Sequence, residues 1–221
     1  MKKTKMDDNF HSYLVENARL VGDAGIPCIM NLCNTQIPKG IISFKRAKSK
    51  KLLASEKRLY VHFYMHDKDF SDLLTSTNRY LSLLKQFDGV ISPDCTLLIG
   101  QSRCLQQTNT YFNRAIGFYL QKNGIPVTPN VRWSDESSFD FCFLGIPQRS
   151  IVSISTHGCM LLKGQHKMFK RGLKEMLKQL VPTDVLVHGY MPGEVFADFL
   201  ADTRFHRFPS EFELTHRGED E

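Results

Sequence analysis

Side chains capable of acid–base chemistry stand directly after several short apolar runs of this 221-residue sequence. Carboxylates and imidazoles in such places can take up and release protons, and an arginine can orient or neutralise an anionic group. A site built from them would suit a phosphate-bearing substrate, either a nucleotide or a nucleic acid. The catalytic candidates are Asp67, Asp94, Asn130, Arg132 and His157.

Most of these candidates also have a purely structural interpretation. Asp67 precedes an expected helix and could cap it, and Asp94 follows a proline and could fix a turn. Arg132 could form a salt bridge with Asp94 or Asp135. Asn130 is harder to explain in this way, because a buried asparagine needs partners for both ends of its amide. The sequence leaves these alternatives open.

The stretch from Thr156 to Cys159 combines an imidazole, a glycine and a thiol. Cys159 could be a nucleophile, although a buried and inert thiol is the default for such a residue. A divalent metal ion is a second possibility, but the spacing matches no known ligand motif, and the cofactor stays unknown. The ligands of such a site would be His66, Asp67, Asp94, His157 and His188.

The excess of positive charge lies in one segment of the chain. There are 29 Lys and Arg against 23 Asp and Glu, and residues 39–58 hold eight of the basic side chains but only one acid. The remainder is nearly neutral, with 21 basic and 22 acidic residues. The segment could bind the phosphates of nucleic acid, or it could be a solvated loop between two strands. The proposed nucleic-acid-binding residues are Lys45, Arg46, Lys48, Lys50 and Lys51.

The elements that would position these residues alternate regularly after residue 60. Short apolar runs are followed by stretches in which apolar residues recur every three or four positions, which is the spacing of one helix face. Strands are expected at 26–30, 40–44, 60–65, 89–91, 126–131, 150–154, 184–187 and 205–208, and helices at 69–87, 105–123 and around 169–180. This rhythm predicts a single α/β domain of repeated βα units with a mostly parallel sheet.

Eight expected strands favour a barrel-like sheet over an open doubly wound sheet, although barrels usually need about 250 residues. In either architecture ligands bind just beyond the carboxyl ends of the strands, where the catalytic candidates stand. We expect residues 1–25 to be a lead-in and residues 26–208 to be the domain, with a basic loop at 39–58. Residues 209–221 are expected to form a flexible tail.

Composition and the absence of motifs exclude several classes of protein. With 42% hydrophobic and 24% charged residues, the chain resembles globular proteins rather than disordered ones. Neither a membrane span nor a secretory signal is evident, and six irregularly spaced cysteines indicate reduced thiols in a cytoplasmic protein. The signatures of P-loop NTPases, dinucleotide enzymes, α/β-hydrolases and zincins are missing.

Several short stretches occur in an order that is typical of one protein family. They are Val61–Tyr64, Gly89–Asp94, Asn113–Gly117, Gly124–Val127, Pro129–Trp133, Phe139–Phe143 with Gly145–Pro147, and Thr156–Cys159. Together they make residues 26–189 resemble a bacterial and phage family called domain of unknown function 4417 (DUF4417). The resemblance implies a prokaryotic, intracellular setting, often in phages and mobile elements, and it implies no activity.

The sequence departs from that family at one loop. Cys95 stands where the family has an aromatic residue, and Leu98–Cys104 lacks an acidic-Met-Pro turn. If a site uses this loop, substrate handling here would differ from that of other members.

Two functions therefore compete. The first is an enzyme at the strand ends, with Asp67 and Asp94 as acid/base or metal-binding carboxylates and His157 as a proton carrier. The alternative is a non-catalytic accessory protein that binds nucleic acid or a host protein through residues 39–58. In that case the polar residues at the strand ends would be caps, turns and ion pairs.

Overall fold

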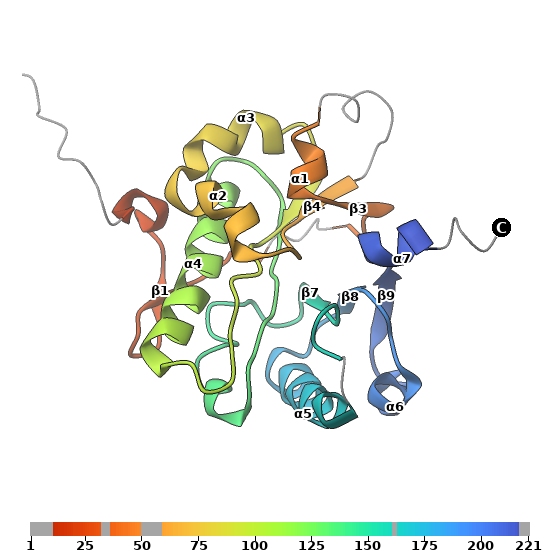
Figure 1. Cartoon of the computed structure of the whole chain (residues 1–221). Helices are drawn as coiled ribbons and strands as arrows, with labels where there is room; N and C mark the ends of the chain where they lie inside the picture. Colours follow the sequence, from red (N-terminus) through yellow and green to blue (C-terminus); the bar gives the residue numbers. More distant parts are fainter. Residues whose placement is uncertain (1–10, 32–35, 50–58, 161–162, 217–221) are drawn as a thin grey trace, which may run out of the picture.

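Two parallel sheets form the centre of the protein, as the computed structural model in Figure 1 shows. The structure describes residues 11–31, 36–49, 59–160 and 163–216. One sheet has four strands in the order β3–β4–β5–β6, and the other has three in the order β7–β8–β9. The strands are β3 Gly40–Ser43, β4 Leu59–His62, β5 Gly89–Ile91, β6 Val127–Thr128, β7 Ile151–Ser155, β8 Asp184–His188 and β9 Arg204–Phe208.

The two sheets continue one another in chain order. A bridge between Asn130 and Ser153 joins the edge of the first sheet to the edge of the second. A doubly wound sheet would reverse its strand order at a switch point, whereas the described strands run from β3 to β9 without a reversal. Since β3 and β9 do not pair within the described ranges, the sheet is barrel-like but not closed. The predicted α/β fold with a mostly parallel sheet is confirmed.

The expected strand at 26–30 does not join either parallel sheet, so that part of the prediction is wrong. Only Ile26–Pro27 form a strand there, β2, and it pairs in antiparallel fashion with β1 Leu20–Val21. Proline has no backbone N–H to donate to a sheet. The next two backbone N–H groups, of Cys28 and Ile29, donate to the carbonyls of Arg19 and Gly145 instead.

The two long helices agree with the periodicity of the sequence. In α4 Arg103–Lys122 the hydroxyl of Ser102 caps the first turn by accepting a hydrogen bond from the Leu105 N–H. The helix ends where Gly124 adopts a φ of 82°, which favours glycine. The second long helix is α5 Lys163–Leu180.

The continuous helix expected at 69–87 is wrong, because the segment is broken into four short turns. These are η2 Asp67–Asp69, α2 Ser71–Thr75, η3 Thr77–Tyr80 and α3 Leu81–Leu84. The break between α2 and η3 falls at Ser76, whose φ of −147° is not helical. Directly after it, the Thr77 hydroxyl donates to the carbonyl of Leu73 at 2.7 Å. Serine and threonine compete with the helical hydrogen bonds in this way.

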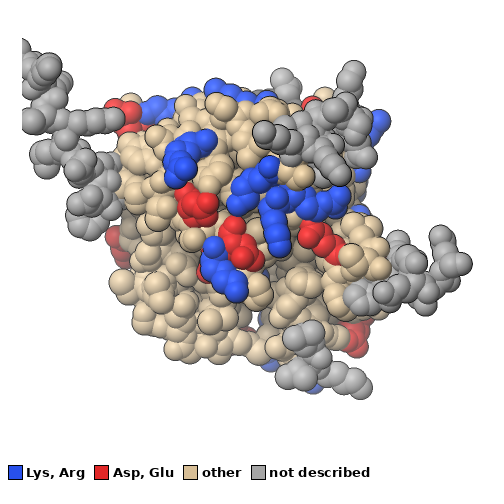
Figure 2. Space-filling model, turned by 45° about the horizontal axis from the view of Figure 1, so that its top comes forward, with Lys and Arg blue, Asp and Glu red and all other residues tan. Residues whose placement is uncertain are grey.

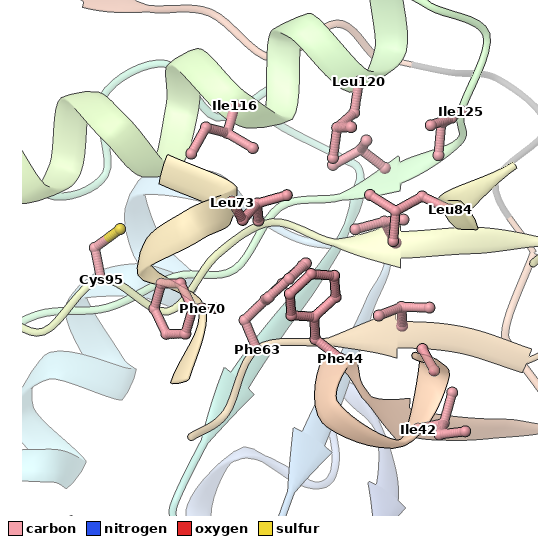
Figure 3. Close-up of a cluster of buried hydrophobic side chains, with 14 of the residues drawn as sticks. Ile42, Phe44, Phe63, Phe70, Leu73, Leu84, Cys95, Ile116, Leu120 and Ile125 are labelled. Carbon is pink, nitrogen blue, oxygen red and sulfur yellow. The ribbon is translucent and has the colours of Figure 1, made fainter. Parts of the chain in front are cut away.

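Three apolar clusters hold these layers together. Figure 3 shows the first, in which Leu73 from α2, Leu84 from α3 and Ile116 from α4 pack over the four-stranded sheet. The second lies between α5, α6 Gly193–Phe196 and the three-stranded sheet. The third brings Tyr64, which follows β4, and Ile91 of β5 against residues of β8 and β9. The two sheets therefore face each other across a shared interior.

The remaining elements are short. They are η1 Ser12–Val15, α1 Phe44–Ala47, η4 Glu136–Ser138, η5 Ala197–Phe199 and α7 Glu211–His216. The basic segment thus begins with β3 and one turn of helix, and the division of the chain at residues 25 and 208 stays a prediction. Within the described part of the chain, no helix combines the length and the apolar character that a membrane crossing requires.

Candidate functional site

A polar cleft of about 450 Å³ opens at the carboxyl ends of the parallel strands. Residues at or shortly after the end of each of the seven strands contribute to its wall. This is the place where parallel α/β sheets bind their ligands, because the connecting loops leave a crevice there. Of the five catalytic candidates, Asp67, Asp94, Arg132 and His157 line the cleft, and Asn130 lies buried directly beside Asp94.

Asp94 and Arg132 form an ion pair in the wall of the cleft. The guanidinium NH1 of Arg132 donates to Oδ2 of Asp94 at 3.2 Å, and both side chains are largely buried. Burial raises the pKa of Asp94, and the charge of Arg132 together with the amide of Asn130 offsets part of that rise. Of the structural alternatives left open, Arg132 therefore forms the salt bridge with Asp94. The side chains that bond the Asp94 carboxylate, Asn130 and Arg132, come from the segment after β6 and not from a local turn.

Asn130 connects this ion pair to the interior. It has no exposed surface, and its Nδ2 donates to Oδ1 of Asp94 at 2.8 Å. Its Oδ1 accepts from the Tyr64 hydroxyl at 3.2 Å, and that hydroxyl also lies 2.6 Å from the hydroxyl of Ser153. Both ends of the buried amide are therefore satisfied, as expected for a buried asparagine. Asn130 fixes the orientation of the Asp94 carboxylate.

Asp67 reaches across the cleft wall rather than capping its own turn. Its carboxylate accepts hydrogen bonds from the hydroxyl of Thr96 at 2.8 Å and from the backbone N–H of Thr96 at 3.3 Å. His66 occupies the cap position of that turn, and no side chain hydrogen-bonds there. Asp67 thus ties the loop after β4 to the loop after β5, which carries Asp94.

Three histidines gather on the other side of the cleft. The ring of His188 lies 4.8 Å from that of His62 and 5.9 Å from that of His157. Burial lowers the pKa of His188 to about 3, and the nearby His157 adds to this shift. Burial and His188 likewise lower the pKa of His62. Both buried rings are therefore neutral near pH 7, while His157 is exposed at the mouth of the cleft.

Ser155 and Tyr64 also belong to the site, although the sequence did not single them out. The hydroxyl of Ser155 lies 3.0 Å from Nδ1 of His188 and accepts a hydrogen bond from the backbone N–H of His157. Tyr64 stacks on His188 with ring centroids 4.7 Å apart. The signal available in the sequence was the alternation of strand residues, since Tyr64 stands two positions after His62 and shares its face.

Three further polar or aromatic residues have structural roles. Asp135 caps η4 by accepting from the N–H of Ser137 at 3.0 Å, and Trp133 packs in the second apolar cluster. Burial raises the pKa of the Cys159 thiol, which fits an inert thiol rather than a nucleophile.

A fully buried arginine supports the site from behind. Arg114 donates to the backbone carbonyls of Asn130, Leu144 and Cys142 at 2.7–3.0 Å, and burial lowers its pKa to about 10. It also donates to Oδ1 of Asn113, whose amide donates to the carbonyl of Asn130. These bonds hold the strand end that carries Asn130 and Arg132.

The basic segment reaches the same cleft. Lys45 lines it, and Arg46 and Lys48 are exposed nearby on and after α1, whereas Lys50 and Lys51 lie outside the described residues. Figure 2 shows that basic side chains gather in the middle of one face with acidic side chains directly beside them. Among the described residues, that face is therefore mixed in charge.

The metal site suggested by the sequence does not assemble. Across the described residues, no group of three or more histidine, cysteine or acidic side chains is arranged to hold a metal ion. All five of its suggested ligands line the cleft, but they are spread around its wall.

The comparison with protein families matches residues 19–209 to the model of "Domain of unknown function (DUF4417)". The chain belongs to the DUF4417 family. This match confirms the resemblance, which rests on short stretches that follow one another in the family's order and lie within the matched residues. No solved structure matches the chain.

Two curated relatives of this DUF4417 protein come from phages. "Gene 1 protein" of Mycobacterium phage L5 is 34% identical over 131 residues, which are 59% of this chain and 57% of the relative. "Gene 1 protein" of Mycobacterium phage D29 is 33% identical over 129 residues, 58% of this chain and 48% of the relative. The matched region thus spans about half the length of these relatives. Both relatives are phage proteins, and neither name states an activity.

Proposed function

We propose that the polar cleft of this DUF4417 protein is the active site of an enzyme that moves protons on a small polar substrate. The observation that supports it most strongly is the arrangement of Asp94, Asn130 and Arg132. The carboxylate of Asp94 is largely buried and held by two hydrogen-bond donors, and it still lines the cleft. Carboxylates with pKa values raised by burial are suited to general acid–base catalysis.

The roles divide between the two sides of the cleft. Asp94 exchanges a proton with the substrate, while Asn130 and Arg132 position its carboxylate and stabilise its charged form. His157, exposed at the mouth, carries protons between the substrate and solvent. Asp67 keeps the two loops of this wall in register through Thr96.

The proposal of a phosphate-bearing substrate is based on two cations that line the cleft, Lys45 and Arg132. Four carboxylates also line the cleft, those of Asp67, Asp69, Asp94 and Glu211. A long polyanion would meet their combined repulsion, whereas a single phosphate can contact the cations alone. Among phosphate-bearing substrates, a small nucleotide therefore fits better than a nucleic acid.

A panel of nucleotides and phosphate monoesters, with and without divalent metal ions, tests this proposal. Binding is read as a rise in melting temperature, because a ligand of the native state stabilises it. Conversion of the compounds that bind is followed by phosphorus NMR. We expect Asp94→Asn and His157→Ala to lower the rate of conversion by about 100-fold or more, the usual contribution of a general acid or base.

Two further variants make the result specific. Lys45→Ala should weaken binding of the phosphate compounds, and Lys85→Ala, which removes an exposed lysine that does not line the cleft, should leave it unchanged. An unchanged rate in a folded Asp94→Asn protein would overturn the catalytic role of Asp94. A panel without any compound that raises the melting temperature would overturn the phosphate-bearing substrate.

The second candidate function is binding of nucleic acid or a host protein through the basic segment. It is favoured by the exposure of Lys45, Arg46 and Lys48 on one edge of the cleft. Affinity for DNA and RNA should then fall steeply with salt, and neutralising Lys45, Arg46, Lys48, Lys50 and Lys51 together should reduce that slope. An unchanged salt slope in this variant would remove the basic segment from the function.

A further inference from the structure

An apolar pocket of about 170 Å³ adjoins the polar cleft. Arg132 and Ser155 line both cavities, so they form the boundary between them. No residue in the proposed acid–base chemistry requires this second cavity. Its position beside the reacting groups places it within reach of another part of a molecule bound in the polar cleft.

The walls of the apolar pocket suit a flat ring. Trp133 and Phe169 form one side, with ring centroids 4.9 Å apart, and Met168 lies beside them. Leu98 and Ile99 form the outer edge and are 55% and 60% exposed, an unusual position for large aliphatic side chains. Aromatic and thioether groups make favourable contacts with aromatic rings.

The size of the pocket limits what can enter. A protein cavity of about 150 Å³ with apolar walls holds one benzene molecule. A pocket of about 170 Å³ therefore has the size that one six-membered ring fills.

We propose that this pocket binds a single aromatic ring of the substrate, a pyrimidine base or a benzene ring, while the polar end of that molecule passes Arg132 and Ser155 into the polar cleft. The inference rests on the proposed function for the polar end, and it adds the chemical class of the remainder. The substrate is then an amphipathic compound with a ring at one end and an anionic group at the other.

Trp133 provides a direct readout of the pocket, because it is the single tryptophan of the chain. The full chain is titrated with uridine 5′-monophosphate and phenyl phosphate, and with ribose 5-phosphate and inorganic phosphate as compounds without an aromatic ring. N-acetyltryptophanamide in the same solutions corrects for light absorbed by the ligands. We expect a saturable change in Trp133 fluorescence with at least one ring compound and none with the other two. The ring compound with the higher affinity shows whether the pocket prefers a pyrimidine base or a benzene ring.

A matched pair of variants tests the location. Leu98→Ser combined with Ile99→Ser removes the outer edge of the pocket and should weaken ring binding about tenfold, since it removes apolar contact area from exposed positions. Leu200→Ser, which changes a leucine that is 58% exposed away from the pocket, should leave the affinity unchanged. Equal affinity in all three proteins, or no saturable response to either ring compound, would overturn the proposal.

The same titration separates this inference from the proposed function. Ring binding that is weakened in the Leu98→Ser/Ile99→Ser protein but is not followed by conversion supports the pocket and contradicts the acid–base site. Conversion that depends on Asp94 but shows no response of Trp133 contradicts the pocket alone.

Discussion

NH1 of Arg132 donates a hydrogen bond to Oδ2 of Asp94 at 3.2 Å, and the side chains keep only 21% and 11% of their surface exposed. The pair joins the loop after β5 to the segment after β6 in the wall of the polar cleft. Removing one partner would leave the other charge poorly hydrated, which costs more than the pair itself contributes.

We therefore expect Arg132→Ala to lower the free energy of unfolding at pH 7 by about 2–4 kcal/mol. Asp94→Asn combined with Arg132→Ala should recover much of this loss, since no charge is then left buried. Urea denaturation of the two single variants and the double variant measures the coupling. Arg171→Ala, which breaks an ion pair whose partners are both 66% exposed, is the control and should have little effect. Additive losses in the double variant would contradict an energetic link between Asp94 and Arg132.

The buried histidines make stability depend on pH. The pKa of His188 is lowered to about 3 and that of His62 is also well below its usual value, so the folded protein leaves both rings neutral. In the unfolded chain they take up protons near pH 6.5. Stability should therefore fall as the pH is lowered from about 6.5 towards 3, by about 1.4 kcal/mol per pH unit for each ring. The raised pKa of Asp94 acts in the opposite direction, because the folded protein binds that proton first.

Urea midpoints at pH 7, 6 and 5 measure this dependence. His188→Gln should flatten the curve by about one proton, as should His62→Gln. A wild-type protein whose stability is constant between pH 7 and pH 5 would show that these rings titrate alike in both states.

Gly172 on α5 leaves room for Trp133. A Cβ at this position would lie 2.0 Å from Nε1 of Trp133, closer than any real contact. We expect Gly172→Ala to destabilise the protein by about 1–3 kcal/mol, because overpacking outweighs the better helix propensity of alanine. Gly164→Ala on the same helix should cause no loss, because among the described residues an added Cβ there meets no atom within 4 Å beyond the chain neighbours and the helix's own backbone. Thermal unfolding with Trp133 fluorescence follows both changes, and equal stability of the two variants would contradict the close packing of Trp133.

The cysteines should differ sharply in reactivity. The five described cysteines are free, and Cys33 lies outside the described residues. Burial raises the pKa of Cys142 to about 12 and that of Cys95 still further, whereas Cys104 is exposed. Iodoacetamide at pH 8 should modify Cys104 within minutes and leave Cys95 and Cys142 unmodified until urea unfolds the chain. Mass spectrometry of the digested protein locates the label, and early modification of Cys95 would contradict the packing of the first apolar cluster.

Local patterns in the sequence were sufficient for most of the elements. The four-residue repeat of apolar residues determined α4 and α5, and the apolar runs ending in polar residues determined β4, β5, β7 and β8. They failed where short-range competition was decisive, as at Ser76, where side-chain hydrogen bonds interrupt a helix of suitable periodicity. They also failed at Pro27, whose strand had no sign of its antiparallel partner.

The candidate site divides in the same way. That Asp94, Arg132 and His157 follow strand ends was visible in the sequence, because all parallel strands direct their carboxyl ends to one side. His188 was also suggested from its place at a strand end, whereas the roles of Ser155 and Tyr64 were not. These residues stand at different strands, and only the curvature of the two sheets brings their side chains across the shared interior.

The sequence by itself determined most of the helices and strands, the parallel direction of the strands in the two central sheets, and which polar residues stand at their ends, because these depend on spacings of a few residues. The tertiary structure alone decided that the sheet stays open, that Asn130 orients Asp94 from within, and that an apolar pocket lies beside the polar cleft. These features depend on residues that are far apart in the chain, such as Asp94 and Asn130, which are 36 positions apart. Their contacts depend on how the sheets twist and how α5 packs against them.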